Sequence, residues 1–208
     1  MNQFKSRYLE PYIAKLGERH YALCFKLMKA IPAFYCIENQ LQNIRENYSG
    51  KVIESSSGTF GLGLAYACAK YDLDLTLVSD QICNIELTNK LKNLGVEVYI
   101  CGESAQDKNI QLKRLDTLRK IQGNKACYWT KQYRNDNVPR SYESMETKII
   151  DKSIFNNLSH IIFPVGSGGS SIGIYNWITN FLNIRPHKVA VDSDKSSLFG
   201  RKVEDRFL

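Results

Sequence analysis

The stretch Glu54-Ser-Ser-Ser-Gly-Thr-Phe-Gly-Leu-Gly-Leu-Ala-Tyr-Ala-Cys-Ala69 decides the fold, and the rest of the chain can be arranged around it. The apolar pair before it, residues 52–53, leads into a serine-rich turn, and small residues at helical spacing follow. This order predicts a strand, a turn and a helix. The unpaired N–H groups and the dipole of such a helix N-terminus favour an anion. Taken alone, the stretch is explained more simply as a helix cap with a glycine-lined packing face.

Strand and helix patterns alternate along the rest of the chain, which predicts an α/β fold whose parallel sheets are covered by helices. The residues at 131–140 are polar and predict a loop. The expected strands are 8–14, 19–26, 51–54, 73–78, 96–101, 126–130, 160–165 and 188–192. The expected helices are 30–47, the glycine-containing helix ending near Tyr71, 84–94, 106–121, 141–152 and 172–182.

Composition narrows the class of protein. The 208 residues are 43% hydrophobic and 24% charged, as in ordinary globular proteins, and carry a net charge of +7. The basic residues are scattered rather than clustered, so we expect no nucleic-acid partner; a solvated basic surface is the simplest explanation, and small anionic ligands would also suit it. Because the chain has neither a membrane-length apolar run nor a secretory apolar core near Met1, we expect a cytoplasmic protein without membrane partners.

The cysteines and histidines give no sign of a metal centre. The chain has six cysteines and three histidines, and no two cysteines have the C-x-x-C spacing of a metal or redox site. Most of the cysteines lie in apolar strand or helix patterns, where reduced buried thiols are common. We therefore predict neither a disulfide nor a bound metal.

A second glycine-rich stretch, Pro164-Val-Gly-Ser-Gly-Gly-Ser-Ser-Ile-Gly173, also lies between a predicted strand and a predicted helix. Consecutive N–H groups in this context can cradle a phosphate. The stretch lacks the Gly-Lys-Ser/Thr of a P-loop, and Ser171 stands where a dinucleotide fingerprint has its third glycine. A phosphate monoester therefore fits better than a pyrophosphate, and a turn without any ligand is the alternative.

The two stretches together resemble the cysteine synthase family of fold type II enzymes, which depend on pyridoxal phosphate (PLP). Residues 54–65 are similar to the family's substrate loop, Glu-Pro-Thr-Ser-Gly-Asn-Thr-Gly-Ile-Gly-Leu-Ala, and residues 166–170 to its Gly-Thr-Gly-Gly-Thr phosphate loop. Residues 132–135 resemble a Gln-Phe-x-Asn segment, and residues 142–144 a Tyr-Glu-Thr segment. The resemblance, which extends to cystathionine β-synthase-like enzymes, implies the fold of the tryptophan synthase β-subunit and a homodimeric assembly. It also implies two lobes, a smaller one at 36–145 and a larger one at 1–35 plus 146–208.

The resemblance also implies site residues and a reaction. Lys29 precedes Ser57 by the same interval as the family's Schiff-base lysine, and would be the catalytic residue and bind the cofactor. The implied reaction is β-elimination or β-replacement on an O-activated serine-type amino acid. The cofactor's ring oxygen would contact Thr59, and its phosphate would bind Gly166, Ser167, Gly168, Gly169 and Ser170. The substrate carboxylate would bind Ser56, Ser57, Gly58 and Gln132.

Several positions depart from the family pattern. Leu27 and Ile31 replace a serine and an arginine beside the lysine, Thr59 replaces an asparagine, and Phe60 replaces a threonine. The chain also stops before the family's substrate-closing loop and its final Ser/Thr-bearing segment, so we expect its C-terminal part to be missing. Two alternatives therefore stay open: a truncated, inactive relative that acts as a binding or regulatory protein, and a nucleotide-binding protein that uses residues 166–173.

Overall fold

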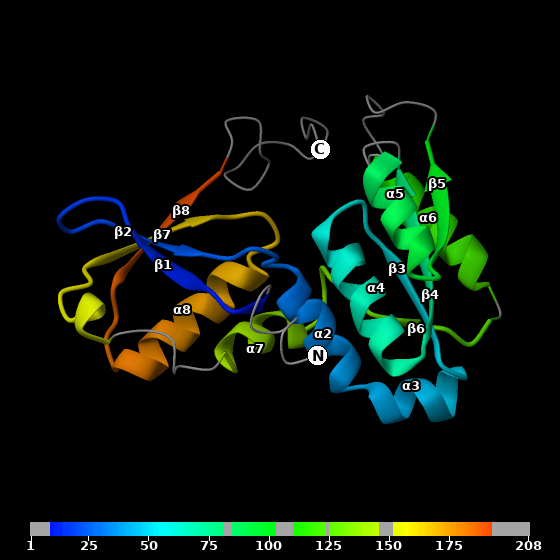
Figure 1. Ribbon diagram of the computed structural model, residues 1–208, viewed down its shortest axis with the longest axis horizontal. Helices are drawn as coiled ribbons and strands as arrows, with labels where there is room; N and C mark the ends of the chain where they lie inside the picture. The colour runs from blue at the N-terminus through cyan, green and yellow to red at the C-terminus, as the bar shows by residue number, and fades with distance from the viewer. Residues whose placement is uncertain (1–8, 81–84, 103–109, 124, 146–151, 193–208) are drawn as a thin grey trace. The chain divides into compact units, whose positions relative to one another are not determined.

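The computed structural model describes residues 9–80, 85–102, 110–123, 125–145 and 152–192. Contacts between Cα atoms divide the described chain into two compact units. The first unit contains the residues up to Pro32 together with Asp136–Asp192, and the second contains Ala33–Asn135. Figure 1 shows the elements of each unit.

The second unit is built on a four-stranded parallel sheet with the order β5-β4-β3-β6. Strand β3 lies inside the sheet, between β4 and β6, and is buried along nearly its whole length. Because both neighbours of β3 supply ladder hydrogen bonds, its carboxyl end is a fixed point from which the serine-rich turn starts. The strands are β3 (Lys51–Ser55), β4 (Asp74–Asp80), β5 (Glu97–Cys101) and β6 (Tyr128–Trp129).

Helices cover both faces of this sheet. On one face Ile53 and Val78 pack with Leu118 of helix α6 (Ile110–Gln122). On the other face, helix α4 (Thr59–Tyr71) approaches so closely that a Cβ atom on Gly61 would lie 3.1 Å from Leu77 Cδ1. Two further helices of this unit are α3 (Leu41–Tyr48), which contacts β3, and α5 (Ile85–Asn93), which contacts β5; most of α2 (Ala30–Glu38) also belongs to this unit.

The first unit has two small sheets. Strands β1 (Tyr12–Lys15) and β2 (Tyr21–Cys24) form an antiparallel hairpin, and β7 (His160–Pro164) pairs in parallel with β8 (His187–Val191). The glycine-rich stretch leads from β7 into α8 (Gly169–Leu182), which packs on α7 (Asn137–Glu143). Gly173 makes this packing possible, because a Cβ atom there would overlap the Pro139 carbonyl oxygen and lie 2.9 Å from Tyr142 Cβ.

The α/β class with parallel sheets covered by helices is confirmed, but three helix boundaries were wrong. The helix expected over 30–47 is two helices, α2 (Ala30–Glu38) and α3, separated by a turn in which Gln40 N–H donates to the Ile37 carbonyl. No glycine or proline marks this break. The packing differs instead: α2 is apolar and largely buried, whereas α3 buries only Ile44.

The helix expected over 141–152 begins earlier, at Asn137, so the expected loop at 131–140 contains its first turn. Pro139 lies in this first turn, where proline is tolerated because the N–H it lacks would have no intrahelical acceptor. Residues 146–151 of that expected helix lie outside the described residues. Helix α8 likewise begins at Gly169 rather than at residue 172, so Gly169 and Ser170 belong to its first turn.

Other sequence expectations can be set beside the described residues. No helix among them has the length and apolarity needed to cross a bilayer, and they contain no cluster of potential metal ligands. The described cysteines are free thiols, and burial raises the pKa of Cys36 and of Cys68 to about 12. Cys83 lies outside the described residues.

Candidate functional site

The serine loop, Ser55–Gly58, joins the end of β3 to the start of α4. Ser56 N–H donates to the Val78 carbonyl at 3.0 Å, which extends the sheet ladder by one residue. The Ser56 hydroxyl oxygen accepts from the N–H groups of Gly61 at 3.0 Å and Gly58 at 3.5 Å, and so caps the helix. The N–H groups of Thr59 and Phe60 have no carbonyl acceptor within the helix. The loop therefore offers donors for an anion.

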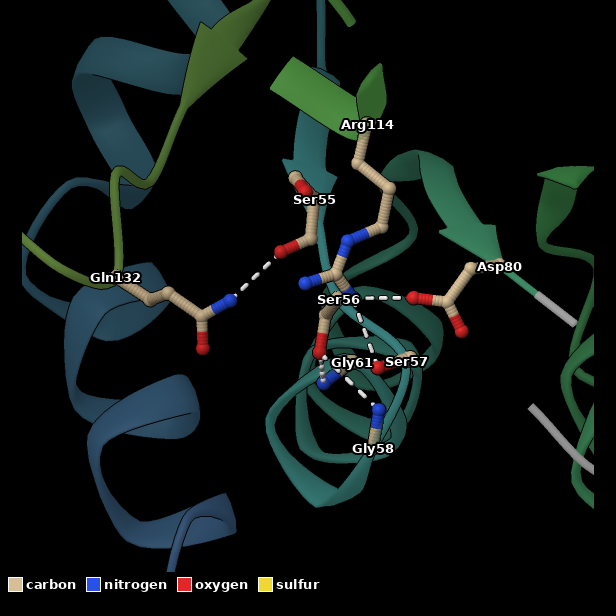
Figure 2. Close-up of polar contacts among 8 residues, drawn as sticks. All are labelled: Ser55, Ser56, Ser57, Gly58, Gly61, Asp80, Arg114 and Gln132. Atoms are coloured by element: carbon tan, nitrogen blue, oxygen red, sulfur yellow. Dashed lines mark hydrogen bonds and ion pairs between the residues drawn. The ribbon is translucent and has the colours of Figure 1, made fainter. Parts of the chain in front are cut away.

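Gln132 lies beside the serine loop in the same unit. Its side-chain Nε2 donates to the Ser55 carbonyl at 2.6 Å, and its backbone N–H donates to Glu54 Oε2 at 3.1 Å. Figure 2 shows Gln132 and Asp80 on opposite sides of the loop. Among the predicted substrate residues, the structure thus brings Ser56, Ser57, Gly58 and Gln132 together.

The buried carboxylate of Glu54 holds the serine loop and Gln132 in place, a role that the sequence analysis did not identify. Its carboxylate is 1% exposed and accepts hydrogen bonds from Ser55 N–H at 2.7 Å, Trp129 Nε1 at 3.2 Å, the Thr130 hydroxyl and Gln132 N–H. Burial raises the pKa of Glu54 above its ordinary value, and the four hydrogen bonds oppose that shift. The carboxylate ties the end of β3 to the segment after β6. Its place at the end of a buried strand was the available signal.

A buried ion pair borders the other side of the serine loop, and it too was missed. Arg114 of α6 and Asp80 at the end of β4 are 7% and 1% exposed, and Arg114 Nη1 lies 3.1 Å from Asp80 Oδ2. The same nitrogen donates to the Ser57 hydroxyl oxygen at 2.8 Å (Figure 2). An arginine in a charged helix pattern reads as solvent-exposed, so periodicity gave no signal for it.

Thr59 and Phe60, the two departures from the family pattern, occupy different environments. Thr59 is the first residue of α4 and is exposed beside the serine loop. The Phe60 side chain is 3% exposed and belongs to the core. Position 60, where the family pattern has a threonine, is filled in this chain by a core side chain.

The glycine loop, Gly166–Ser170, lies in the first unit at the start of α8. Gly168 has φ +82°, the left-handed conformation that favours glycine, and a Cβ atom on Gly166 would meet nothing within 4 Å. The hydroxyls of Ser167 and Ser170 form no hydrogen bond with other described residues. An open, glycine-lined turn with uncommitted hydroxyls at the N-terminus of a 14-residue helix fits a phosphate group.

Lys29 also lies in the first unit, at the turn before α2, and it is exposed. A buried tyrosine holds this turn in place. Tyr142 is 1% exposed, and its hydroxyl donates to the Met28 carbonyl at 3.0 Å. The rings of Tyr142 and Phe25 meet edge to face at 6.3 Å. The lysine is thus presented to solvent on a fixed piece of backbone.

The chain can now be compared with known proteins. A family model described as "Pyridoxal-phosphate dependent enzyme" matches residues 2–207. The chain belongs to this family. The match covers nearly the whole sequence and therefore includes both the serine loop and the glycine loop.

Solved structures agree with the family fold. A hydrogen sulfide-producing enzyme from Fusobacterium nucleatum matches with a TM-score of 0.72 and 21% identity, over 92% of this chain and 66% of its own. An O-acetylserine dependent cystathionine beta-synthase from Helicobacter pylori matches with a TM-score of 0.71 and 19% identity, over 84% of this chain and 56% of its own. A cysteine synthase from Entamoeba histolytica matches with a TM-score of 0.74 and 16% identity, over 93% of this chain and 60% of its own. This chain therefore spans less than two thirds of the length of each of these structures.

Proposed function

We propose that this protein binds pyridoxal phosphate and catalyses β-elimination or β-replacement on an O-activated serine-type amino acid, as a cysteine synthase does. The observation that carries the proposal is the serine loop at the N-terminus of α4, because it offers hydroxyl and N–H donors beside Gln132. In a member of the pyridoxal-phosphate dependent family, such a loop suits the carboxylate of an amino acid. Similarity to enzymes named for O-acetylserine chemistry supports this substrate class.

Each group of residues has a part in the proposed reaction. Four residues bind and orient the substrate carboxylate: Ser56, Ser57, Gly58 and Gln132. Ser56 also holds the loop in shape by accepting from the Gly61 N–H. Gly166–Ser170 hold the cofactor phosphate, and Thr59 contacts the cofactor's ring oxygen. Bound pyridoxal phosphate would act as an electron sink for the electron pair left when the Cα–H bond breaks. Lys29 Nζ would hold the cofactor in the resting protein and, once the substrate amine has displaced it, would accept the Cα proton as the leaving group departs from Cβ.

The decisive experiment locates the cofactor on the chain. Purified protein is mixed with pyridoxal phosphate, reduced with borohydride and digested, and the modified lysine is identified by mass spectrometry. We expect modification at Lys29, loss of that modification in Lys29→Ala, and no loss in the control Lys26→Ala, which removes a neighbouring exposed lysine. Modification elsewhere, or undiminished labelling of Lys29→Ala protein, would contradict the assignment.

Activity is measured separately, as acetate released from O-acetyl-L-serine and as cysteine formed when sulfide is added.

We propose that the active form is a homodimer, which sedimentation can test. The larger cofactor-binding lobe would include residues 1–35 with 146–208, and the smaller lobe residues 36–145.

A second function is favoured by one observation, the buried Phe60 at a position where the family pattern has a polar residue. A chain without that contact would bind the cofactor or an amino acid and serve as a binding or regulatory protein. Cofactor labelling at Lys29 without turnover of O-acetyl-L-serine would support this alternative over the first. Binding of NAD or ATP in place of pyridoxal phosphate would contradict both.

A further inference from the structure

Arg114 is the charged side chain whose burial most needs an explanation. A buried guanidinium costs free energy unless an anion and hydrogen-bond acceptors compensate for lost water. Asp80, 3.1 Å away, provides the anion. Arg114 Nε, however, is buried without a hydrogen-bond acceptor among the described residues. The protein thus keeps a costly arginine that its surroundings only partly satisfy.

The hydrogen bond that Arg114 donates to Ser57 is directed at the serine loop. Arg114 Nη1 lies 3.1 Å from Asp80 Oδ2 as an ion pair and donates a hydrogen bond to the Ser57 oxygen at 2.8 Å. A guanidinium has only donors, so the Ser57 oxygen must act as the acceptor in this contact. The hydroxyl's own hydrogen is then directed to another group. Ser57 is half-buried, so that hydrogen remains accessible from outside.

A donor next to a cation is a good partner for an anion. Hydrogen bonds in a chain polarise one another, so accepting from a guanidinium strengthens the donor character of the Ser57 O–H. Without Arg114, the Ser57 hydroxyl would be free to rotate and point its hydrogen into the protein instead of toward a ligand. Asp80 in turn fixes the guanidinium, because Asp80 is the last residue of β4 and Arg114 lies within α6, a helix that packs against β4.

We propose that Arg114, held by Asp80, is a positioning residue that makes Ser57 a hydrogen-bond donor to the carboxylate of the amino-acid ligand. This inference rests on the proposed function of the serine loop. It is more specific than that function, because it assigns the orientation of one hydroxyl to one ion pair that the sequence motifs do not contain.

The test is a double-mutant cycle on ligand binding. Binding of L-serine and O-acetyl-L-serine to the protein mixed with pyridoxal phosphate is measured by calorimetry for wild type, Arg114→Gln, Ser57→Ala and the double variant. We expect Arg114→Gln to weaken binding about tenfold, the loss typical of one net hydrogen bond, and to have little effect when Ser57→Ala is already present. L-serine methyl ester, which lacks the carboxylate, should show no coupling.

Two controls separate positioning from general damage. Arg119→Gln removes another arginine of α6, whose ion pair with Asp116 is exposed, and should leave binding unchanged. If Arg114→Gln does not fold, Arg114→Lys keeps the charge near Asp80 but lacks the planar fork, and the same cycle is run with it.

The outcomes are distinct. Equal weakening by the Arg114 variant with and without Ser57→Ala, or equal weakening of the methyl ester, would overturn the inference and leave the proposed function standing. Wild-type protein that binds neither amino acid would contradict the proposed function and this inference together.

Discussion

The serine loop and the glycine loop both join a parallel strand to a helix, but their supports differ. The serine loop follows β3, a buried strand with a partner on each side, and its conformation is fixed by Ser56, Glu54, Gln132 and Arg114. The glycine loop follows β7, whose one described partner strand is the exposed β8. Its serine hydroxyls form no hydrogen bond with other described residues.

The difference teaches where each loop obtains its shape. Polar side chains arrange the serine loop in advance, so a ligand there meets donors that are already oriented. In the glycine loop the backbone and the packing of α8 on α7 provide the shape, and the hydroxyls are left for a ligand. Substitutions should therefore disturb the serine loop through lost hydrogen bonds, and the helix that follows the glycine loop through steric overlap at Gly173.

The largest effect is expected at Glu54. In Glu54→Gln an amide NH2 replaces an acceptor that faces four donors, and we expect a loss of about 3 kcal/mol in the free energy of unfolding. Urea denaturation measures this, with Glu46→Gln, an exposed glutamate, as a control that should change stability by less than about 0.5 kcal/mol. A loss no larger than that of the control would show that the serine loop does not depend on this anchor.

The same residue gives a dependence on pH. Because the pKa of Glu54 is raised in the folded protein, the folded state binds this proton more tightly than the unfolded state. Its contribution to stability is then fully present below the unfolded pKa and is lost as pH rises through the folded pKa. The stability advantage of wild type over Glu54→Gln should therefore shrink as pH rises above the ordinary pKa of a glutamate; an advantage that grows would reverse the direction of the shift.

The next effect concerns the glycine loop and its helix. Gly173→Ala places a methyl group against the Pro139 carbonyl oxygen and the Tyr142 side chain, and should cost about 2 kcal/mol. Gly166→Ala adds the same methyl group to open space and should leave thermal stability nearly unchanged. The affinity for pyridoxal phosphate, measured by absorbance, should show the reverse: Gly166→Ala should weaken cofactor binding more than Gly173→Ala does. Equal destabilisation by both would contradict the division into a packed and an open side.

The sequence predicted the order of elements and both loops, because glycine, serine and apolar runs carry local information. It did not predict that Arg114 is buried, since burial beside Asp80 depends on a contact between α6 and β4 far apart in the chain. The break between α2 and α3 was hidden for a similar reason, because packing rather than a breaking residue ends the first helix. Glu54 was visible in the motif, but three of its four donors belong to residues 129–132, which only the fold brings beside it.

A smaller effect compares serines of the two loops. Ser56→Ala removes the acceptor for the Gly61 N–H and should cost about 1 kcal/mol, as the loss of a helix cap does. Ser170→Ala removes a hydroxyl with no partner among the described residues and should cost little. Thermal unfolding of both variants without ligand, and then with saturating pyridoxal phosphate, checks the contrast. We expect the cofactor to stabilise the Ser170 variant less than wild type, and an unchanged cofactor effect would remove Ser170 from the phosphate site.

The smallest effect is expected at the turn that carries Lys29. Tyr142→Phe keeps the ring against Phe25 but removes the hydrogen bond to the Met28 carbonyl, at a cost of about 0.5–1 kcal/mol. Tyr175→Phe is a matched control, because its hydroxyl donates to the Pro186 carbonyl at 3.4 Å in the same unit, away from the Lys29 turn. If the Tyr142 contact positions Lys29, borohydride labelling of Lys29 should slow in Tyr142→Phe and not in Tyr175→Phe. Equal labelling rates would mean that the first unit, unlike the second, does not use a buried polar contact to prepare its reactive residue.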